Sequence, residues 1–136
     1  MGAETNDQIV KVRVRPTSFV APDNWVGVML RARDDGRNHV YVSLRGRGVI
    51  SLWRRIGGTI EQLATRDVPV TIGTWYDLRV EVVGGLTRVF VNNQLQLSTN
   101  ADLGPIDTIR PIALGQVGLI TYKATADFDD FRAYQP

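Results

Sequence analysis

The sequence predicts an all-β fold in which two antiparallel sheets pack face to face. Apolar residues recur at every second position along most of the chain, which is the period of a strand with one buried face. Clusters of Gly, Pro, Asn and Asp separate these stretches at short intervals, as turns do between strands. No stretch of ten residues has the 3.6-residue period of a helix. These three observations predict a β-sandwich without a substantial helix.

Three stretches show the alternation most clearly. Residues 10–14 alternate valine with basic residues and are predicted to form a strand that ends at Pro16. Residues 39–45 and 76–82 alternate in the same way, with one face on the core and the other toward solvent or a ligand. The predicted core contains Val12, Val28, Leu30, Val40, Val42, Leu44, Leu78, Val80, Val82, Val89, Val91 and Leu119.

Three dipeptides predict tight hairpin turns between consecutive strands: Gly57-Gly58, Gly84-Gly85 and Asn92-Asn93. The sequence has no internal repeat and no low-complexity linker, and 136 residues suit one well-cored domain better than two. We therefore expect a single sandwich domain over residues 1–136, with residues 1–8 irregular or derived from an expression tag.

Composition excludes several classes of site. The chain has no cysteine, so it has no disulfide framework, thiolate zinc site or cysteine nucleophile. Its 16 basic residues are balanced by 14 acidic ones, which argues against a dedicated nucleic-acid-binding protein. No apolar run approaches the ~20 residues that span a bilayer, so we expect no membrane partner. The first residues lack the pattern of a signal peptide, and we expect an extracellular, secreted domain that belongs to a larger protein.

Seven stretches carry a family resemblance through their order and spacing: 28–35 (VMLRARDD), 39–44 (HVYVSL), 50–55 (ISLWRR), 73–80 (GTWYDLRV), 87–92 (TRVFVN), 115–119 (GQVGL) and 126–131 (ADFDDF). Together they resemble the laminin-G-like, concanavalin A-like jelly rolls that are appended to bacterial polysaccharide-degrading enzymes. The resemblance implies a two-sheet antiparallel jelly roll. It also implies a lectin-like, carbohydrate-binding module with a catalytic domain in the same parent chain.

Catalytic patterns are missing, so the chain is predicted not to be an enzyme. The single histidine, His39, would have to serve any histidine-dependent reaction. The glutamates are widely separated, whereas glycoside hydrolysis needs a pair of carboxylates across one bond. Nucleophile-elbow, Walker and dinucleotide glycine motifs do not occur.

The predicted binding face is the one opposite the core. An aromatic ring can stack on the apolar face of a sugar, and arginine can bind a carboxylate through two hydrogen bonds. These side chains suit a polysaccharide or oligosaccharide, including an acidic one such as a uronate polymer. The predicted ligand-binding residues are Arg31, Arg33, His39, Tyr41, Arg45, Trp53 and Arg55.

Other interpretations of these residues stay open. Trp53 is as well explained as a core residue, and Tyr41 and His39 as ordinary cross-strand neighbours. Trp75 at a strand entry is predicted to be structural, whereas Trp25 fits either a cap of the sandwich or a rim. The alternative functions are a protein–protein or adhesion module of laminin-G-like type and a structural spacer.

Two neighbouring carboxylates, Asp129 and Asp130, lie in the predicted last strand. Calcium binds six to eight oxygens, mainly from carboxylates and carbonyls. The family resemblance implies that an aspartate at this position helps to hold a structural calcium ion. We therefore expect Asp129 or Asp130 to be its ligand.

Overall fold

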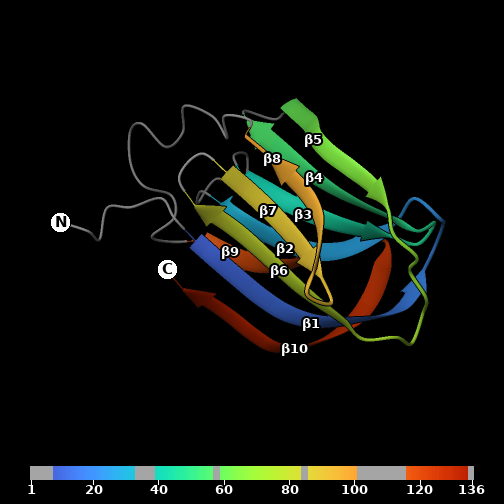
Figure 1. The fold of residues 1–136 in the computed structure, drawn as a ribbon. Helices are drawn as coiled ribbons and strands as arrows, with labels where there is room; N and C mark the ends of the chain where they lie inside the picture. Colours follow the sequence, from blue (N-terminus) through green and yellow to red (C-terminus); the bar gives the residue numbers. More distant parts are fainter. Residues whose placement is uncertain (1–7, 33–38, 57–58, 84–85, 101–115, 135–136) are drawn as a thin grey trace.

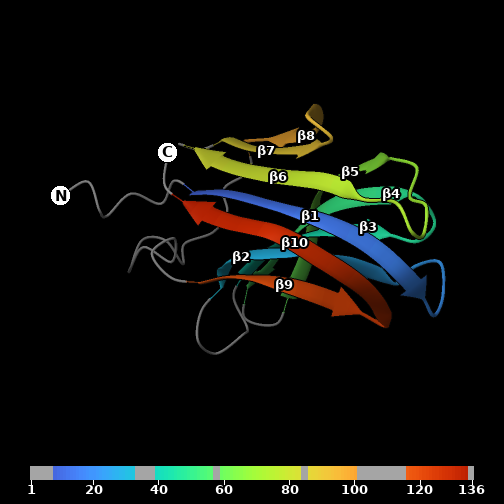
Figure 2. The same ribbon diagram turned by 90° about the horizontal axis from the view of Figure 1, so that it is seen from below.

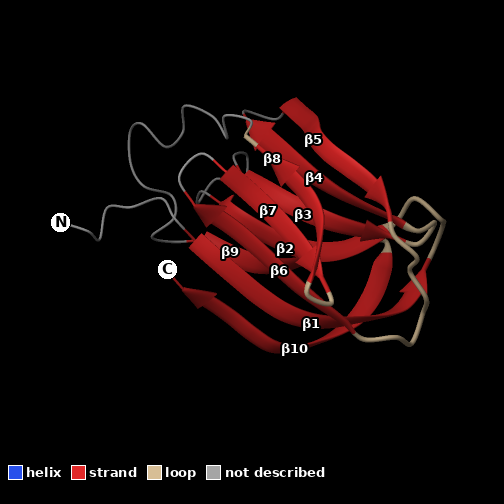
Figure 3. Cartoon of the chain, in the orientation of Figure 1, coloured by secondary structure: helices blue, strands red, loops and turns tan. Residues whose placement is uncertain are grey.

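The computed structural model describes residues 8–32, 39–56, 59–83, 86–100 and 116–134. These residues form ten strands and no helix (Figure 3). The strands are β1 (Gln8–Phe19), β2 (Trp25–Ala32), β3 (His39–Arg45), β4 (Val49–Ile56), β5 (Thr59–Asp67), β6 (Tyr76–Val83), β7 (Leu86–Val91), β8 (Gln94–Thr99), β9 (Gln116–Tyr122) and β10 (Ala124–Tyr134). Nothing in the described ranges is a helix of the length and apolarity needed to cross a membrane.

The strands form two antiparallel sheets of five, which confirms the predicted sandwich. The first sheet has the order β10-β1-β6-β7-β8, and the second has the order β5-β4-β3-β2-β9. The two views of Figures 1 and 2 show the sheets stacked as two layers. Near its end the chain passes from the second sheet, which contains β9, to the first, which contains β10.

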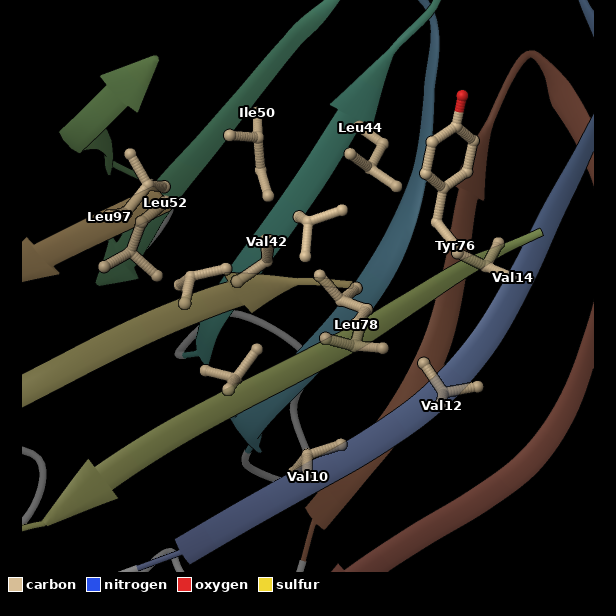
Figure 4. Close-up of a cluster of buried hydrophobic side chains, with 14 of the residues drawn as sticks. Val10, Val12, Val14, Val42, Leu44, Ile50, Leu52, Tyr76, Leu78 and Leu97 are labelled. Carbon is tan, nitrogen blue, oxygen red and sulfur yellow. The ribbon is translucent and has the colours of Figure 1, made fainter. Parts of the chain in front are cut away.

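The core lies between the inner faces of the two sheets (Figure 4). In β6 and β7 every second residue points inward and is buried, and the residues between are half-buried or exposed. Full burial of one aliphatic side chain stabilises the fold by about 1.5–3 kcal/mol. The predicted core residues Val12, Val28, Val40, Val42, Leu44, Leu78, Val80, Val82, Val89 and Val91 are all buried.

One predicted core residue is wrong. Leu119 is 42% exposed although it lies opposite the buried Val28. Its strand, β9, is the edge of the second sheet, so Leu119 has no neighbouring strand on its other side. The strand pairing at Leu30 is described, but its side chain lies outside the described residues.

The predicted end of the first strand at Pro16 is also wrong, because β1 continues to Phe19. The β1–β6 ladder stops at the pair Val14–Tyr76, so β1 has a partner on only one side from Pro16 onward. On that side the β1–β10 register shifts between Pro16 and Ser18. A proline that lacks an N–H fits such a position without breaking a ladder hydrogen bond.

The hairpin predicted at Asn92-Asn93 is confirmed. Both residues have positive φ, 52° and 67°, as a two-residue turn between twisted strands requires. Asn92 also exchanges two hydrogen bonds with the backbone of Asp77, at 2.8 and 2.9 Å. The glycine pairs 57–58 and 84–85 lie outside the described residues, but the strands that they join are antiparallel neighbours.

Candidate functional site

A continuous stack of aromatic rings crosses four strands on the outer face of the second sheet. The rings of Trp25 and Tyr41 are 5.1 Å apart at an interplanar angle of 14°. Tyr122 stacks on the other side of Trp25 at 6.3 Å, and Trp53 stacks on Tyr41 at 6.0 Å. We call these four residues, Tyr122, Trp25, Tyr41 and Trp53, the aromatic stack.

The backbone beneath the stack carries small residues. Gly27 comes so close to β3 that a Cβ built on it would lie 1.7 Å from the carbonyl oxygen of Val42. Ser43, opposite Gly27, is fully buried and accepts a hydrogen bond from the indole N–H of Trp53 at 3.0 Å. This bond fixes the Trp53 ring, and the small residues leave room for the rings to lie over the sheet.

Burial differs sharply along the aromatic stack. Trp25 and Tyr41, in the middle, are only 8% and 7% exposed. Tyr122, at the end on the edge strand, is 51% exposed. The faces of the two middle rings are therefore covered by each other and by the neighbouring rings, whereas Tyr122 has an exposed ring face.

A cavity of about 400 Å³ lies beside the stack. Three of its walls are aromatic, and two are the side chains of isoleucines on β5 and β9. No described carboxylate lines it. The lining residues are Trp25, Tyr41, Arg55, Ile60, Ile120, Thr121 and Tyr122.

Arg55 provides the only described charge in this cavity. Its Nε is buried and has no hydrogen-bond partner, and Arg55 forms no ion pair with a residue that the structure describes. A buried polar group without a partner is costly, and a charged one more so. The guanidinium is therefore available to an anionic group that enters the cavity.

Tyr41 and Arg45 are held more tightly by the protein itself. Burial raises the pKa of Tyr41, while the positive charges of Arg45 and Arg55 act in the opposite direction. The Arg45 guanidinium donates to the carbonyl oxygen of Asp23 and lies 5.2 Å from the centre of the Trp53 ring. Arg45 is thus a structural partner of the aromatic stack.

The structure brings four of the predicted binding residues together: Tyr41, Arg45, Trp53 and Arg55 all lie on the outer face of the second sheet. Trp53 is not a core residue, so one of the two open interpretations is settled. Trp25 and Trp53 stack on Tyr41, so its ring lies within the stack, and its role as a ligand-binding residue stays a prediction.

The other predicted residues are only partly described. Arg31 lies in β2, and His39 lies in β3 opposite Arg55, but their side chains are outside the described residues. Arg33 lies outside the described residues altogether.

Sequence reasoning missed Tyr122 and left Trp25 undecided. The sequence does contain a signal for Trp25. It occupies the same set of alternate positions along β2 as Gly27 and Met29, and these positions face away from the core. Tyr122 carries no such signal, because its position opposite Trp25 depends on the pairing of β2 with β9, which are distant in sequence. The guanidiniums of Arg13 and Arg15 each lie over the ring of Trp75, at 4.8 Å from its centre.

The predicted calcium ligands lie at a bulge of β10. Asp130 has a positive φ of 51°, and its N–H donates to Asp129 Oδ1 at 2.8 Å. Among the described residues, no group of three or more His, Cys, Asp or Glu side chains could hold a metal. These two carboxylates alone do not supply the six to eight oxygens of calcium, so the calcium ion stays a prediction.

Comparison with known proteins places this fold. No protein-family model matches the chain, and no curated protein matches its sequence. Among solved structures, the carbohydrate binding module CBM66 from Bacillus subtilis superposes with a TM-score of 0.73 at 14% identity, over 93% of this chain and 74% of that one. Sheep galectin-11 superposes with a TM-score of 0.66 at 13% identity, over 96% of this chain and 91% of the galectin.

A GH43 protein from Bacillus licheniformis has a TM-score of 0.70 at 16% identity, over 97% of this chain. This chain spans only 28% of the length of that protein. At such low identities the similarities establish the fold and no more. The chain has a two-sheet antiparallel β-sandwich fold, which these solved structures share.

Proposed function

We propose that this chain is a non-catalytic module that binds a polysaccharide in the cavity beside the aromatic stack. The observation that carries the proposal is the composition of this cavity: aromatic and aliphatic walls around one arginine that has no described partner. Binding sites of this kind combine apolar walls with a few polar groups that orient the ligand.

The apolar rim gives a sugar a place to stack. Tyr122 and Ile60 are 51% and 52% exposed, and both line the cavity. The C–H face of a pyranose packs on an aromatic ring, and the ring hydroxyls can exchange hydrogen bonds with water at the open side. We expect Tyr122 to supply the stacking ring, with Trp25 and Tyr41 as the fixed wall behind it.

The favoured ligand is an acidic polysaccharide. Arginine binds carboxylates through two parallel hydrogen bonds, which are stronger than neutral ones. A uronate residue stacked on Tyr122 would bring its carboxylate toward Arg55, since both side chains line the same cavity. No described carboxylate in the cavity would repel it.

The fold comparisons support the same proposal. One similar structure is named a carbohydrate binding module and another is a galectin. The GH43 protein, of which the matching part is about a quarter, suggests how such a module can be joined to a longer chain. We propose that this module likewise works outside the cell beside a catalytic domain, which it holds near a polymeric substrate.

Affinity electrophoresis against neutral and uronate polysaccharides tests the proposal. We expect polygalacturonate or alginate to retard the wild-type protein. Tyr122→Ala should lose most of this retardation, because a stacked ring contributes about 1–3 kcal/mol by analogy with base stacking. Runs with calcium and with chelator test the predicted metal separately.

Arg66→Gln is the matched control for Arg55→Gln, since Arg66 is exposed on β5 and lies outside the cavity. We expect Arg55→Gln to weaken binding of uronate polymers about tenfold and to leave neutral polymers unaffected. If no polysaccharide retards a folded wild-type sample, the proposal is wrong, and a protein–protein or spacer module takes its place.

A further inference from the structure

A row of three positive charges crosses the outer face of the first sheet. Lys11 in β1 lies directly opposite Arg132 in β10 on one side and directly opposite Arg79 in β6 on the other. Residues paired in this way share one face of a sheet, with Cβ atoms about 4.5–5.5 Å apart. Like charges at such positions destabilise a sheet.

The neighbouring rows are arranged differently. Arg13 lies between Asp129 and Asp77 in the same two ladders, and its Nε contacts Asp77 Oδ1 at 3.2 Å. Arg15 lies opposite Asp127 and forms an ion pair with it. Opposite charges therefore alternate in these rows, whereas the row of Arg132, Lys11 and Arg79 contains cations only.

Within that row, Arg79 is fixed by its surroundings. Its guanidinium donates to Asn93 Oδ1 at 2.9 Å and contacts Glu81 Oε2 at 3.0 Å. It also stacks on Phe90, with 4.0 Å between the guanidinium carbon and the ring centre. Lys11 and Arg132, by contrast, form no ion pair or hydrogen bond through their side chains with any described residue.

These cations surround a hollow of about 330 Å³. Lys11, Arg13, Arg79 and Arg132 line it, together with the side-chain amide of Asn93. Two carboxylates also line it, those of Asp77 and Asp130. The lining residues carry four positive and two negative charges, and Glu81 beside Arg79 offsets one positive charge more, so the hollow keeps an excess of positive charge.

We propose that this hollow binds an oxyanion group: a sulfate, a phosphate or a carboxylate. The fixed Arg79 would share the anion with Lys11 and Arg132, which have no described ion-pair partner, and the anion would offset the repulsion within the row. The site lies on the opposite sheet from the aromatic cavity and does not depend on the function proposed there. A domain with both sites can hold two segments of an anionic polymer at once.

Thermal unfolding with added sulfate or phosphate, at constant ionic strength set with sodium chloride, tests the inference. We expect the Tm of the wild type to rise with the concentration of sulfate or phosphate and to reach a plateau when the hollow is saturated. Lys11→Gln and Arg132→Gln should weaken the apparent affinity about tenfold, the loss of one charge-assisted hydrogen bond. Arg66→Gln, which removes an exposed charge on the other sheet, should respond as the wild type does.

The variants also separate a binding role from a structural one. Without anion, Lys11→Gln should unfold at the same temperature as the wild type or higher, because it removes a like-charge contact. A residue kept for stability alone would lower the Tm when replaced. An identical response of all four proteins to sulfate and phosphate would be a general salt effect, and it would overturn the inference.

Retardation by polymers then identifies the source of the anion. Heparin carries sulfate groups and polygalacturonate carries carboxylates, and each is compared with the inorganic ions. Retardation that is lost in Lys11→Gln and kept in Arg55→Gln assigns a polymer-borne anion to the hollow. Loss in Arg55→Gln alone assigns the polymer to the aromatic cavity and leaves only small oxyanions for the hollow.

Discussion

The outer faces of the two sheets use arginine in opposite ways. On the first sheet, Arg13 and Arg15 pair with carboxylates, and the guanidinium of each lies over the ring of Trp75. On the second sheet, Arg55 lines a cavity with aromatic walls and has no described partner. Both faces carry aromatic rings and guanidiniums, but the first pairs its guanidiniums with carboxylates, whereas no described carboxylate lines the cavity on the second.

This difference shows how charge pairing separates a solvated face from a binding face. Exposed ion pairs such as those of Arg13 and Arg15 contribute little stability, but they leave no charge unpaired. Arg55 gains no such partner from the described protein, although its Nε is buried. The same comparison within the first sheet singles out Lys11 and Arg132, two cations without an ion-pair partner among the described residues.

The largest effect that distinguishes the faces is expected from their tryptophans. Trp25→Ala removes a ring that is 8% exposed and is stacked on both sides, so we expect a loss of about 3–5 kcal/mol in the free energy of unfolding. Trp75→Ala removes a half-buried ring over which two guanidiniums lie, and we expect a loss of about 1–2 kcal/mol. Urea unfolding measures both. Equal losses would contradict the distinction between the packed ring of Trp25 and the more exposed ring of Trp75.

The next largest loss of stability is expected at Gly27, in the backbone beneath the aromatic stack. Gly27→Ala places a methyl group against the carbonyl oxygen of Val42, so β2 and β3 must move apart. We expect a loss of about 1–3 kcal/mol in stability, as for other overpacked sites. Because the rings lie over this backbone, near-ultraviolet circular dichroism should change as well. Gly46→Ala is the comparison, since the nearest atom to its Cβ would be Phe19 Cγ at 2.8 Å, so that a side chain has to move and not the backbone of a paired strand.

On the first sheet, Glu81 is the acid on which two arginines depend. It is 16% exposed and contacts Arg79 at 3.0 Å and Arg88 at 2.8 Å. We expect Glu81→Gln to cost about 1 kcal/mol, because solvent screens part of the lost attraction. Asp127→Asn breaks one more exposed pair, with Arg15, and should cost less. Urea unfolding at low and high salt checks both, and salt should shrink each difference.

The fold could be predicted because its signals are local. The alternation of valines assigns Val12, Val42 and Val80 to the core, and the paired asparagines specify a turn with positive φ. Leu119 and Pro16 were mispredicted for one shared reason: each depends on which strand lies next to it. The edge position of β9 and the early end of the β1–β6 ladder are tertiary facts that alternation does not encode.

The candidate site, like the fold, could be predicted only where the signal is local. Parity places Tyr41, Trp53 and Arg55 on one face from two consecutive strands, and the structure agrees. The alternation of residues along a strand does not show that Tyr41 is covered on both sides. Nor does it show that Tyr122, near the end of the chain, joins the stack. Burial of a ring within a row needs the order of the strands, which the sequence pattern leaves open.

The smallest expected effect concerns the hydroxyl of Tyr41. Burial raises its pKa above the ordinary value of 10.0, against the opposing charges of Arg45 and Arg55. Between the unfolded and the folded pKa, the native state therefore holds a proton that the unfolded state has released, and stability falls as pH rises. This contribution is fully present below about pH 10 and is lost above it.

Tyr41→Phe keeps the stacked ring and removes this titration. We expect the difference in unfolding free energy between wild type and Tyr41→Phe to shrink as pH rises above about 10, because only the wild type loses stability through this group. Tyr122→Phe is the control, since its ring is half exposed and lies at the open end of the stack. If the two variants respond alike to alkaline pH, the middle of the stack is no more shielded than its end. The contrast between a packed wall and an open stacking ring would then fail.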